Sequence, residues 1–534
     1  MEDKKGFAER VRALRINPDA LDKVVVSEVG VEIPNAYGKR SSLQIYADIT
    51  NPDGYISPDE ARRGLSVFGE DYQEEARANP GMHPNIDGLA KIVELGGAVR
   101  SDVYRRDSIR MHPFSDDVLF ETAKRFGTPV IVYDEATIRD KITRLKVAFS
   151  WVPGGFMNHI AAKATDCIPI IQIACEEGMG VDCASAKELH MAKAMGITGD
   201  RVILTSNATP AKLYRQARDM NATINFDDPT HIDFFRKEVG ALPPIVYLRY
   251  NPGNRMTGGN KIIGEPGKQK CGIMHEHMLS ALEKLKEGGV SEVGFHQMIV
   301  SNELREENLI EAAGNLLVLA DEWSRAVDIP LHGVNFGGGL GHAYKPEHIN
   351  VDEKEVAWGI KRIYEEKIVT GRNAELKLRM ENGRWLTAES GVLLMEALHI
   401  EQKPGGMYIR TDASGNDFAR VEAYGCYQHL VVLGKSGNAE VYNVAGPKCE
   451  NSDHWAKNRL LPRVEEGDIL ALCGAGAHGH MMGSGYNGFP RCGEVMWRTD
   501  GTLEMLTRPE NLRDQFTKYD FKGSKFAHLA RIEE

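Results

Sequence analysis

The chain has 534 residues, enough for roughly three domains of ordinary size. Its 76 acidic residues outnumber its 65 basic residues and give a net charge of −11, so we expect no partner of the nucleic-acid type and no binding to an anionic membrane. The 8 cysteines contain no Cys-x-x-Cys pair, which predicts reduced thiols and a cytoplasmic location. No run of about 18 apolar residues occurs, so no membrane span is expected.

Residues 1–110 are charged and irregular, and we expect an N-terminal extension of unknown role there. One stretch, NPDGYISPDEARRG, has part of the pattern of a calcium-binding loop. Ile49 stands where the first ligand is needed and Pro58 falls in the exit helix, so a turn followed by a capped helix is the better interpretation. Within residues 111–135, the segment FGTPVIVYD is expected to form a strand that joins a later β domain.

Between residues 136 and 395, short apolar segments rich in Val, Ile and aromatic residues alternate with segments of helical periodicity. The expected strands are FMNHIAAKA, GMGVDCAS, RVILTS, ATINFD, PIVYLRY, EVGFHQMIVS, LHGVNFGGG and ELKLRME. Eight such βα units close into a parallel (β/α)8 barrel of the TIM type. The predicted fold class is therefore α/β.

Residues 396–534 change to a period-two pattern, which predicts a C-terminal antiparallel β domain with a tail. Its expected strands are MYIRT, ARVEAYG, HLVVLG, AEVYNVAG and DILALCG. The hairpin EVMWRTDGTLEMLT is expected to reverse at Asp500 and Gly501 in a type I′ turn.

The residues that could do chemistry follow barrel strands, where the reacting groups of this fold lie. Lys163 follows the first strand, and Glu381 and Arg384 follow the eighth, which neighbours the first across the barrel closure. The glycines at 337–339 follow the seventh strand and let backbone N–H groups approach an anion. Pyridoxal 5'-phosphate requires such a set of lysine, carboxylate and phosphate cradle. We expect desolvation to lower the pKa of the Lys163 amine.

From about residue 111 to 505 the chain resembles the pyridoxal-phosphate decarboxylases of the alanine-racemase-like barrel fold, fold type III. It is most similar to diaminopimelate decarboxylase and next to ornithine decarboxylase. The motifs occur in order: FGTPVIVYD, AAKAT, GVDCASAKEL, KCGI, NFGGGLG, ENGR, RVEAYG, GPKCENSD and GAHGHMMGSGYNG. The resemblance implies decarboxylation of an amino acid with a polar or charged side chain, in a homodimer with active sites at the subunit interface.

The resemblance also implies a role for each matching residue. Lys163 is expected to form the Schiff base with the cofactor, and Cys449 to enter from a second subunit and supply the proton that replaces the lost carboxylate. Glu381 is expected at the pyridine nitrogen. The other expected cofactor contacts are Ser301, Gly337, Gly338, Gly339, Arg384, Met298 and His478. The expected substrate contacts are Arg420, Tyr424, Glu450 and Tyr486, and no metal is expected.

Four positions, in three motifs, depart from the family pattern. Met298 stands where the family has a histidine stacked on the cofactor, with Val300 at a family glycine; His478 replaces a tyrosine; and Asn382 replaces a proline. We expect His296 to point to the opposite face of its strand. The departures favour a specialised relative that acts on another polar or charged amino acid. A pyridoxal-phosphate-dependent racemase or epimerase and a non-catalytic regulatory homologue stay open as alternatives.

Overall fold

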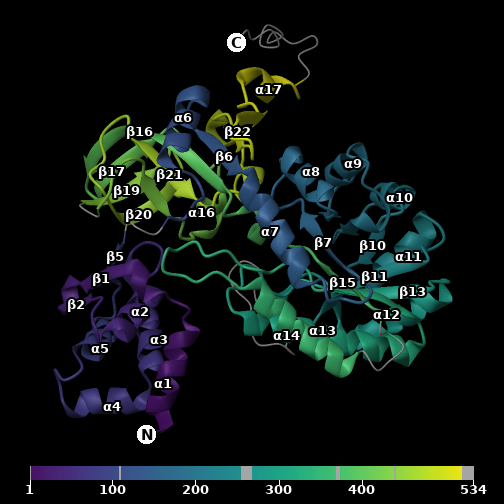
Figure 1. Ribbon diagram of the computed structural model, residues 1–534, viewed down its shortest axis with the longest axis horizontal. Helices are drawn as coiled ribbons and strands as arrows, with labels where there is room; N and C mark the ends of the chain where they lie inside the picture. Colours follow the sequence, from purple (N-terminus) through teal and green to yellow (C-terminus); the bar gives the residue numbers. More distant parts are fainter. Residues whose placement is uncertain are drawn as a thin grey trace. The chain divides into compact units, whose positions relative to one another are not determined.

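The computed structural model describes residues 2–106, 110–253, 268–368, 373, 375–437 and 440–519. The chain divides into two compact units, shown in Figure 1. The first unit comprises residues 1–134, 343–349 and 389–534, and the second comprises residues 135–342 and 350–388. Residues 520–534, at the end of the predicted tail, lie outside the described residues. No helix in the described ranges is long and apolar enough to span a bilayer.

The second unit is a closed parallel barrel, as predicted. Its strands pair in the order β7, β8, β9, β10, β11, β13, β14, β15 and back to β7, and the short β12 (Ile273–Met274) pairs with β11. The barrel strands coincide with the predicted segments: β7 (Phe156–Ala161), β8 (Gly180–Cys183), β9 (Val202–Thr205), β10 (Thr223–Phe226), β11 (Ile245–Asn251), β13 (Glu292–Gln297), β14 (Leu331–Asn335) and β15 (Lys377–Met380).

Helices alternate with these strands and surround the barrel in Figure 1. They are α7 (Glu135–Ala148), α8 (Ile168–Glu176), α9 (Ala186–Ala194), α10 (Ala211–Asp219), α11 (Pro229–Glu238), α12 (His275–Glu287), α13 (Glu306–Val327) and α14 (Glu353–Lys367), with the short α15 (Arg384–Thr387) after β15. Each long helix buries one side; in α10, for example, Leu213, Tyr214 and Ala217 are buried. The burial of one helix face against the strands explains the helical periodicity of these segments.

The inside of the barrel contains side chains, among them the fully buried ring of Tyr247. A Cβ atom at Gly294 would lie 2.3 Å from Cζ of Tyr247, and one at Gly333 would lie 2.5 Å from its hydroxyl, so both positions leave room for the ring only as glycine. The guanidinium carbon of Arg379 lies 5.5 Å from the ring centroid and Nη1 donates to the Asp200 carbonyl at 3.0 Å. With the interior packed, chemistry is left to the strand ends.

The C-terminal part of the first unit is a β domain. One sheet runs in the order β20, β19, β17, β16, β6, β22, β23, with β18 and β21 pairing off this path. β6 (Val130–Asp134) pairs with β16 (Gly391–Lys403) and β22 (Gly493–Trp497), so the segment FGTPVIVYD contributes a strand to this sheet. The other elements are α6 (Asp116–Phe126), β17 (Gly406–Thr411), β18 (Leu430–Val432), β19 (Glu440–Ala445), β20 (His454–Leu461), β21 (Ile469–Cys473), β23 (Leu503–Thr507) and α17 (Leu512–Phe516). Most of its strand pairs are antiparallel, while β17–β19 and β6–β22 are parallel.

Two local predictions in this domain are wrong. The segment ARVEAYG forms the helix α16 (Arg420–Tyr424), not a strand, and the helix ends at Gly425 with a φ of 56°. Glycine accepts this left-handed conformation without strain and often ends a helix. In the hairpin β22–β23 only Gly501 of the two turn residues has a positive φ, of 83°. A type I′ turn needs a positive φ at both central residues.

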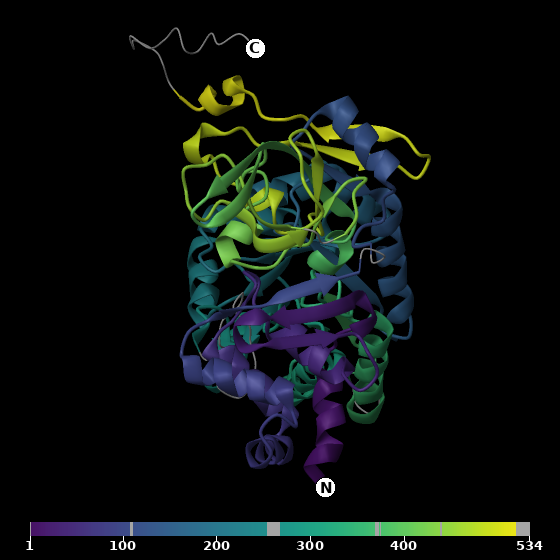
Figure 2. The same ribbon diagram turned by 90° about the vertical axis from the view of Figure 1, so that its left-hand side faces the viewer.

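The N-terminal region (residues 2–105) contains α1 (Glu2–Ala13), α2 (Arg40–Ile49), α3 (Pro58–Phe68), α4 (Glu70–Ala78) and α5 (Pro84–Leu95). They accompany a sheet ordered β2 (Val31–Pro34), β1 (Leu21–Val26), β5 (Asp102–Arg105) and a pair of β3 (Tyr55–Ile56) with β4 (Val99–Arg100). Figure 2 shows this region in purple and blue, with α1 beginning at the labelled N-terminus. Leu43, Tyr46 and Ile92 are fully buried in a hydrophobic core of its own.

The stretch that partly matches a calcium loop forms the predicted turn and capped helix. The Asn51 side chain accepts hydrogen bonds from the backbone N–H groups of Asp53 and Tyr55 at 3.1 and 3.0 Å. Ser57 caps α3 and forms a reciprocal capping box with Glu60. The side-chain oxygens of Asn51, Ser57 and Glu60 therefore accept hydrogen bonds from nearby backbone N–H groups.

Candidate active site

Lys163 lies just beyond the end of β7, at the C-terminal end of the barrel strands. Its Nζ donates a hydrogen bond to Oδ2 of Asp182, on the neighbouring β8, at 2.8 Å. The Lys163 side chain is 48% exposed, whereas that of Asp182 is 3% exposed. A buried carboxylate thus holds an amine that solutes can reach.

The carboxylates near Lys163 control its protonation. Burial by itself lowers the pKa of the Lys163 amine, but the charges of Asp182 and Glu381 outweigh burial and the net pKa lies above its ordinary value. The expectation that desolvation would lower this pKa is therefore wrong for the chain alone. Burial and the charge of Glu381 raise the pKa of Asp182 to about 6, against the opposing effect of Lys163. Sequence reasoning missed Asp182, although it lies in β8, next to the strand that Lys163 follows.

Glu381 follows β15 and is 3% exposed. Its Oε1 accepts a hydrogen bond from Nδ2 of Asn335 at 2.8 Å, and its Oε2 lies 3.2 Å from Nε2 of His296. Burial would raise the pKa of this carboxyl, but His296, Lys163 and Asn335 hold the pKa of Glu381 below its usual range. Glu381 therefore stays ionised at the strand ends and can bind a protonated ring nitrogen.

The prediction that His296 points to the opposite face is wrong, because His296 points into the barrel toward Glu381. Its neighbours on β13 face the helices: the ring of Phe295 lies 5.2 Å from that of Trp323 on α13, and Gln297 donates to the Ala312 carbonyl at 2.8 Å. Alternation along a strand places His296 on the inner face. Sequence reasoning could have found this residue by using Phe295 as the helix-facing reference.

The predicted phosphate cradle after β14 is a backbone turn that glycine alone fits. Gly337 has a φ of 71° and Gly339 a φ of 128°. A Cβ atom at Gly337 would lie 2.2 Å from the Gln297 carbonyl oxygen, and one at Gly338 would lie 2.8 Å from the Glu381 carbonyl oxygen. The loops after β13, β14 and β15 therefore meet here, and backbone N–H groups in such a turn suit an anion.

The other barrel residues predicted from the sequence lie at this same end. Ser301 is half-buried in the loop after β13, and Arg384 is the first residue of α15 and is 7% exposed. Met298 places Sδ 3.3 Å from the Gly338 nitrogen, so its thioether packs on the glycine turn.

Asn382, at the family's proline, joins three strand ends. Its backbone N–H and Nδ2 donate to Oδ1 of Asn158 at 2.9 and 3.2 Å, and its own Oδ1 accepts from the Leu340 N–H at 3.3 Å. The amide side chain supplies hydrogen bonds that proline cannot make. Asn382 therefore connects β7 with the loop after β14.

The predicted Cys449, Glu450, Tyr486 and His478 lie in the first unit. Sγ of Cys449 is 3.7 Å from the Tyr486 hydroxyl and 3.4 Å from Oδ1 of Asn487. The side chains of Cys449, Glu450 and Tyr486 are exposed, and His478 has a φ of 54°. The hydrogen bond and charge of Cys449 raise the pKa of Tyr486.

Arg420 and Tyr424 lie on α16 of the first unit. Arg420 is 4% exposed, while Tyr424 is 42% exposed. The guanidinium carbon of Arg420 lies 3.6 Å from the ring centroid of Tyr344, and Nη1 donates to Oε1 of Gln428 at 2.5 Å. Its buried Nε has no hydrogen-bond partner among the described residues.

The barrel residues fit pyridoxal phosphate. Lys163 offers an accessible amine for covalent attachment, Glu381 a buried anionic carboxylate for the ring nitrogen, and the glycine turn a cradle for the phosphate.

Comparisons with known proteins agree with this fit. The family model described as the pyridoxal-binding domain of pyridoxal-dependent decarboxylases matches residues 135–388, and a model for uncharacterised proteins conserved in bacteria matches residues 16–102. Protein TabA of Pseudomonas amygdali pv. tabaci is 32% identical over 406 residues, which are 76% of this chain and 93% of TabA. Diaminopimelate decarboxylase of Methanothermobacter thermautotrophicus is 30% identical over 396 residues, 74% of this chain and 92% of that enzyme.

A solved structure of a decarboxylase is also similar to this chain. Diaminopimelate decarboxylase from M. jannaschii, in complex with L-lysine, has a TM-score of 0.68 and 27% identity and covers 75% of this chain and 94% of its own. These relatives do not favour the racemase or the non-catalytic alternative. The chain belongs to the family of pyridoxal-dependent decarboxylases and is a pyridoxal-phosphate-dependent amino-acid decarboxylase.

Proposed function

We propose that the chain removes the carboxylate of an amino acid with a polar or charged side chain, at a site built on Lys163, Glu381 and the glycine turn at 337–339. The observation that carries this assignment is the accessible Lys163 amine, 2.8 Å from Asp182, at the same strand ends as the buried anionic Glu381. Pyridoxal phosphate, when bound, supplies the electron sink for the bond that breaks.

Residues of the chain itself bind, orient and move protons. Lys163 Nζ attaches the cofactor, and Asp182, with a pKa of about 6, lies close enough to take up and return the proton of that amine. Glu381, fixed by Asn335 and His296, holds the ring nitrogen. The remaining cofactor contacts that we propose are Ser301, Gly337, Gly338, Gly339, Arg384, Met298 and His478.

The side-chain end of the substrate is proposed to contact residues of the first unit. Arg420 supports this role because its buried Nε is left without a hydrogen-bond partner among the described residues, and an arginine fork suits a carboxylate. We assign Tyr424, Glu450 and Tyr486 to the same end. The replacement of a stacking histidine by Met298 favours a specialised substrate over the usual diaminopimelate.

We further propose a cytoplasmic homodimer in which Cys449 of one subunit completes the site of Lys163 in the other. Cys449 is exposed, and its Sγ lies near the Tyr486 hydroxyl, so it could present a proton to a neighbouring subunit. The cysteines in the described ranges form no disulfide with one another, which supports a reducing compartment.

The cofactor assignment is tested by visible absorption of the purified protein before and after borohydride. We expect a visible band that borohydride abolishes, that is absent in Lys163→Ala, and that persists in Lys187→Ala, a matched exposed lysine paired with Asp166. A screen for carbon dioxide release over amino acids with charged, polar and apolar side chains then identifies the substrate. A wild-type protein that stays colourless with added pyridoxal phosphate contradicts the assignment, and release from apolar amino acids alone contradicts the substrate class.

The shared site is tested by mixing two inactive variants, Lys163→Ala and Cys449→Ala. If each site combines residues from two subunits, half of the re-formed dimers carry one intact site, so roughly a quarter of wild-type activity returns. Subunit exchange is checked with differently tagged variants. Exchanged dimers without activity would show that Lys163 and Cys449 act within one subunit or that Cys449 has no such role.

A further inference from the structure

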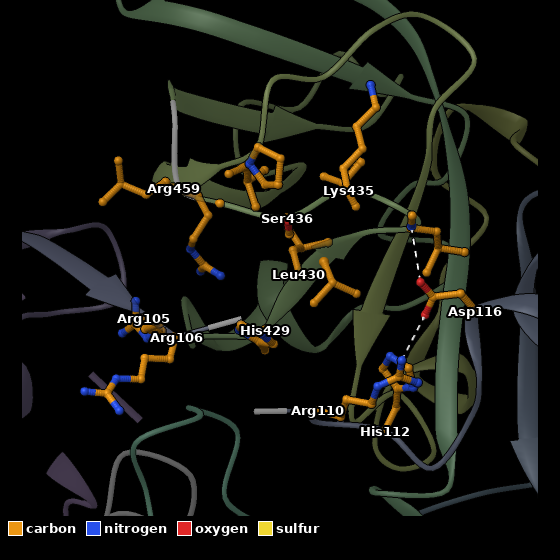
Figure 3. A pocket seen from close by; sticks show the side chains of 18 of the residues that line it. Arg105, Arg106, Arg110, His112, Asp116, His429, Leu430, Lys435, Ser436 and Arg459 are labelled. Carbon is orange, nitrogen blue, oxygen red and sulfur yellow. Dashed lines mark hydrogen bonds and ion pairs between the residues drawn. The ribbon is translucent and has the colours of Figure 1, made fainter. Parts of the chain in front are cut away.

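A cavity of about 360 Å³ lies in the first unit and contains none of the predicted cofactor or substrate residues. Its walls come from the end of β5 and the segment that follows, from β18 with its flanking residues, and from the end of β20 (Figure 3). The N-terminal region and the β domain thus both contribute to it. Its volume is in the range of sites for small molecules.

The polar part of the cavity lining is basic. Arg105, Arg110 and Arg459 line it together with the imidazoles of His112 and His429, as Figure 3 shows. Asp116 is the one carboxylate among the described lining residues, and it accepts from the Gly434 N–H at 3.3 Å and lies 3.9 Å from Arg110. Apolar side chains such as Leu433 form the rest of the wall.

Several of the cations around the cavity are neutralised by the protein itself. Arg105 makes two hydrogen bonds to Glu347, at 2.7 and 2.8 Å. Arg106 contacts Asp22 at 3.0 Å. Lys435 contacts Asp468 at 2.5 Å, and its amine points away from the cavity in Figure 3. These three cations therefore need no ligand to neutralise their charge.

Arg459 differs, because it is 7% exposed and forms no ion pair with a carboxylate among the described residues, although the charge of Glu347 acts on it. Its Nη1 donates to the Gln428 carbonyl at 3.0 Å, and its guanidinium carbon lies 3.9 Å from the ring centroid of Tyr427. A carbonyl and an aromatic face solvate a cation but do not neutralise it. A buried cation without a counter-ion is destabilising.

Burial is the main cause of the lowered pKa values of the two neighbouring histidines, and nearby positive charge adds to its effect. Burial, with Arg459 and Arg105, lowers the pKa of His429 to about 3. Burial and Arg110 lower the pKa of His112, whose Nδ1 has no hydrogen-bond partner among the described residues. An anion in the cavity would offset the contribution of the positive charges to these shifts.

We propose that this cavity binds a small organic oxyanion, a phosphomonoester or a polycarboxylate, with Arg459 and Arg110 as its main contacts and His112 as a further donor. The arginines supply fork-shaped donors that match a phosphate or carboxylate group. The apolar part of the wall, including Leu433, accommodates the carbon skeleton. The cavity shares no lining residue with the proposed decarboxylation site, and the proposal does not depend on the roles assigned there.

The test is calorimetric titration of the holoenzyme, saturated with pyridoxal phosphate, at constant ionic strength. The probes are glucose 6-phosphate, citrate and sodium chloride. We expect binding of glucose 6-phosphate, of citrate or of both, with no response to chloride and no change in the visible spectrum of the cofactor. Binding of one probe alone identifies phosphate or carboxylate as the chemistry. Absence of binding by both organic anions at millimolar concentration would overturn the proposal.

Two variants locate the binding. Arg459→Gln and Arg110→Gln should each weaken affinity about ten- to a hundredfold, the loss expected for a charged hydrogen bond. Arg110 is 60% exposed, so its replacement keeps the test valid if Arg459→Gln fails to fold. Arg513→Gln, at an exposed position of α17 in the same unit, is the matched control and should bind as the wild type does. Equal affinity in Arg110→Gln and the control would refute the assigned site.

Discussion

Replacement of Glu347 by glutamine should strongly destabilise the N-terminal region. The Glu347 side chain is 0% exposed and accepts hydrogen bonds from Nε and Nη2 of Arg105 at 2.8 and 2.7 Å, while Arg105 is 14% exposed. The Asn17 N–H also donates to the Glu347 carbonyl, at 2.6 Å, so the pair lies where segment 343–349 meets this region. Loss of one partner of a buried ion pair costs about 3–5 kcal/mol because the other charge stays buried.

The pH dependence of this pair has a definite sign. Burial raises the pKa of Glu347, but Arg105 and Lys345 outweigh burial and hold it below its usual range. The folded pKa is then lower than the unfolded value of about 4.3. The stabilisation is therefore complete above that unfolded value and is lost as the pH falls through the folded pKa.

Hydrogen exchange measures this effect in peptides that cover β1 and β5. A loss of about 3–5 kcal/mol corresponds to exchange that is faster by about two to three and a half orders of magnitude. Glu32→Gln is the matched control in the same region, since the side chains of Glu32 and Lys23 are 59% and 38% exposed and an exposed ion pair contributes little to stability. Equal acceleration in the two variants would refute the reasoning.

Two further substitutions test the barrel mouth and the β domain. Asp182→Asn removes the nearest carboxylate of Lys163, so the amine pKa should fall and the pH profile of cofactor recombination with the apoenzyme should move to lower pH; an unshifted profile contradicts this. Gly391→Ala places a Cβ atom 2.3 Å from backbone atoms of Gly476 and should cost about 1–3 kcal/mol in urea unfolding. Gly97→Ala, which meets no atom within 4 Å, should change stability by less than about 0.5 kcal/mol, and similar losses in both would disprove the steric argument.

The barrel could be predicted from the sequence because each of its strands is buried on both faces and appears as a short apolar segment. Because both faces are buried, the sequence does not show which side chains point into the barrel and which point toward the helices. His296 lies in a segment whose residues are all buried except the half-buried Glu292, so hydrophobic alternation alone did not assign its face. Asp182 was missed for a similar reason. A single carboxylate in a barrel strand does not indicate a functional role until its contact with Lys163 is known.

The helix α16 shows that a short local pattern does not distinguish a helix from a strand. In the segment RVEAY, alternation over five residues is equally compatible with a strand, and the structure buries the adjacent Arg420 and Val421. Gly425 was the available signal, because it takes a φ of 56° and ends the helix. The contacts of Arg420 with Gln428 and Tyr344 come from segments distant in the sequence, so no local pattern could predict them.

Gln428 joins the proposed anion cavity to a residue that we assign to the substrate. Its carbonyl accepts from Nη1 of Arg459 at 3.0 Å, its Oε1 accepts from Nη1 of Arg420 at 2.5 Å, and its Nε2 donates to the Cys473 carbonyl at 2.5 Å. Gln428 is 0% exposed, so its side chain is held by packing as well as by these bonds. An anion that draws Arg459 toward the cavity would act on the group that orients Arg420. Because such coupling is reciprocal, substrate affinity and anion affinity should change by the same factor.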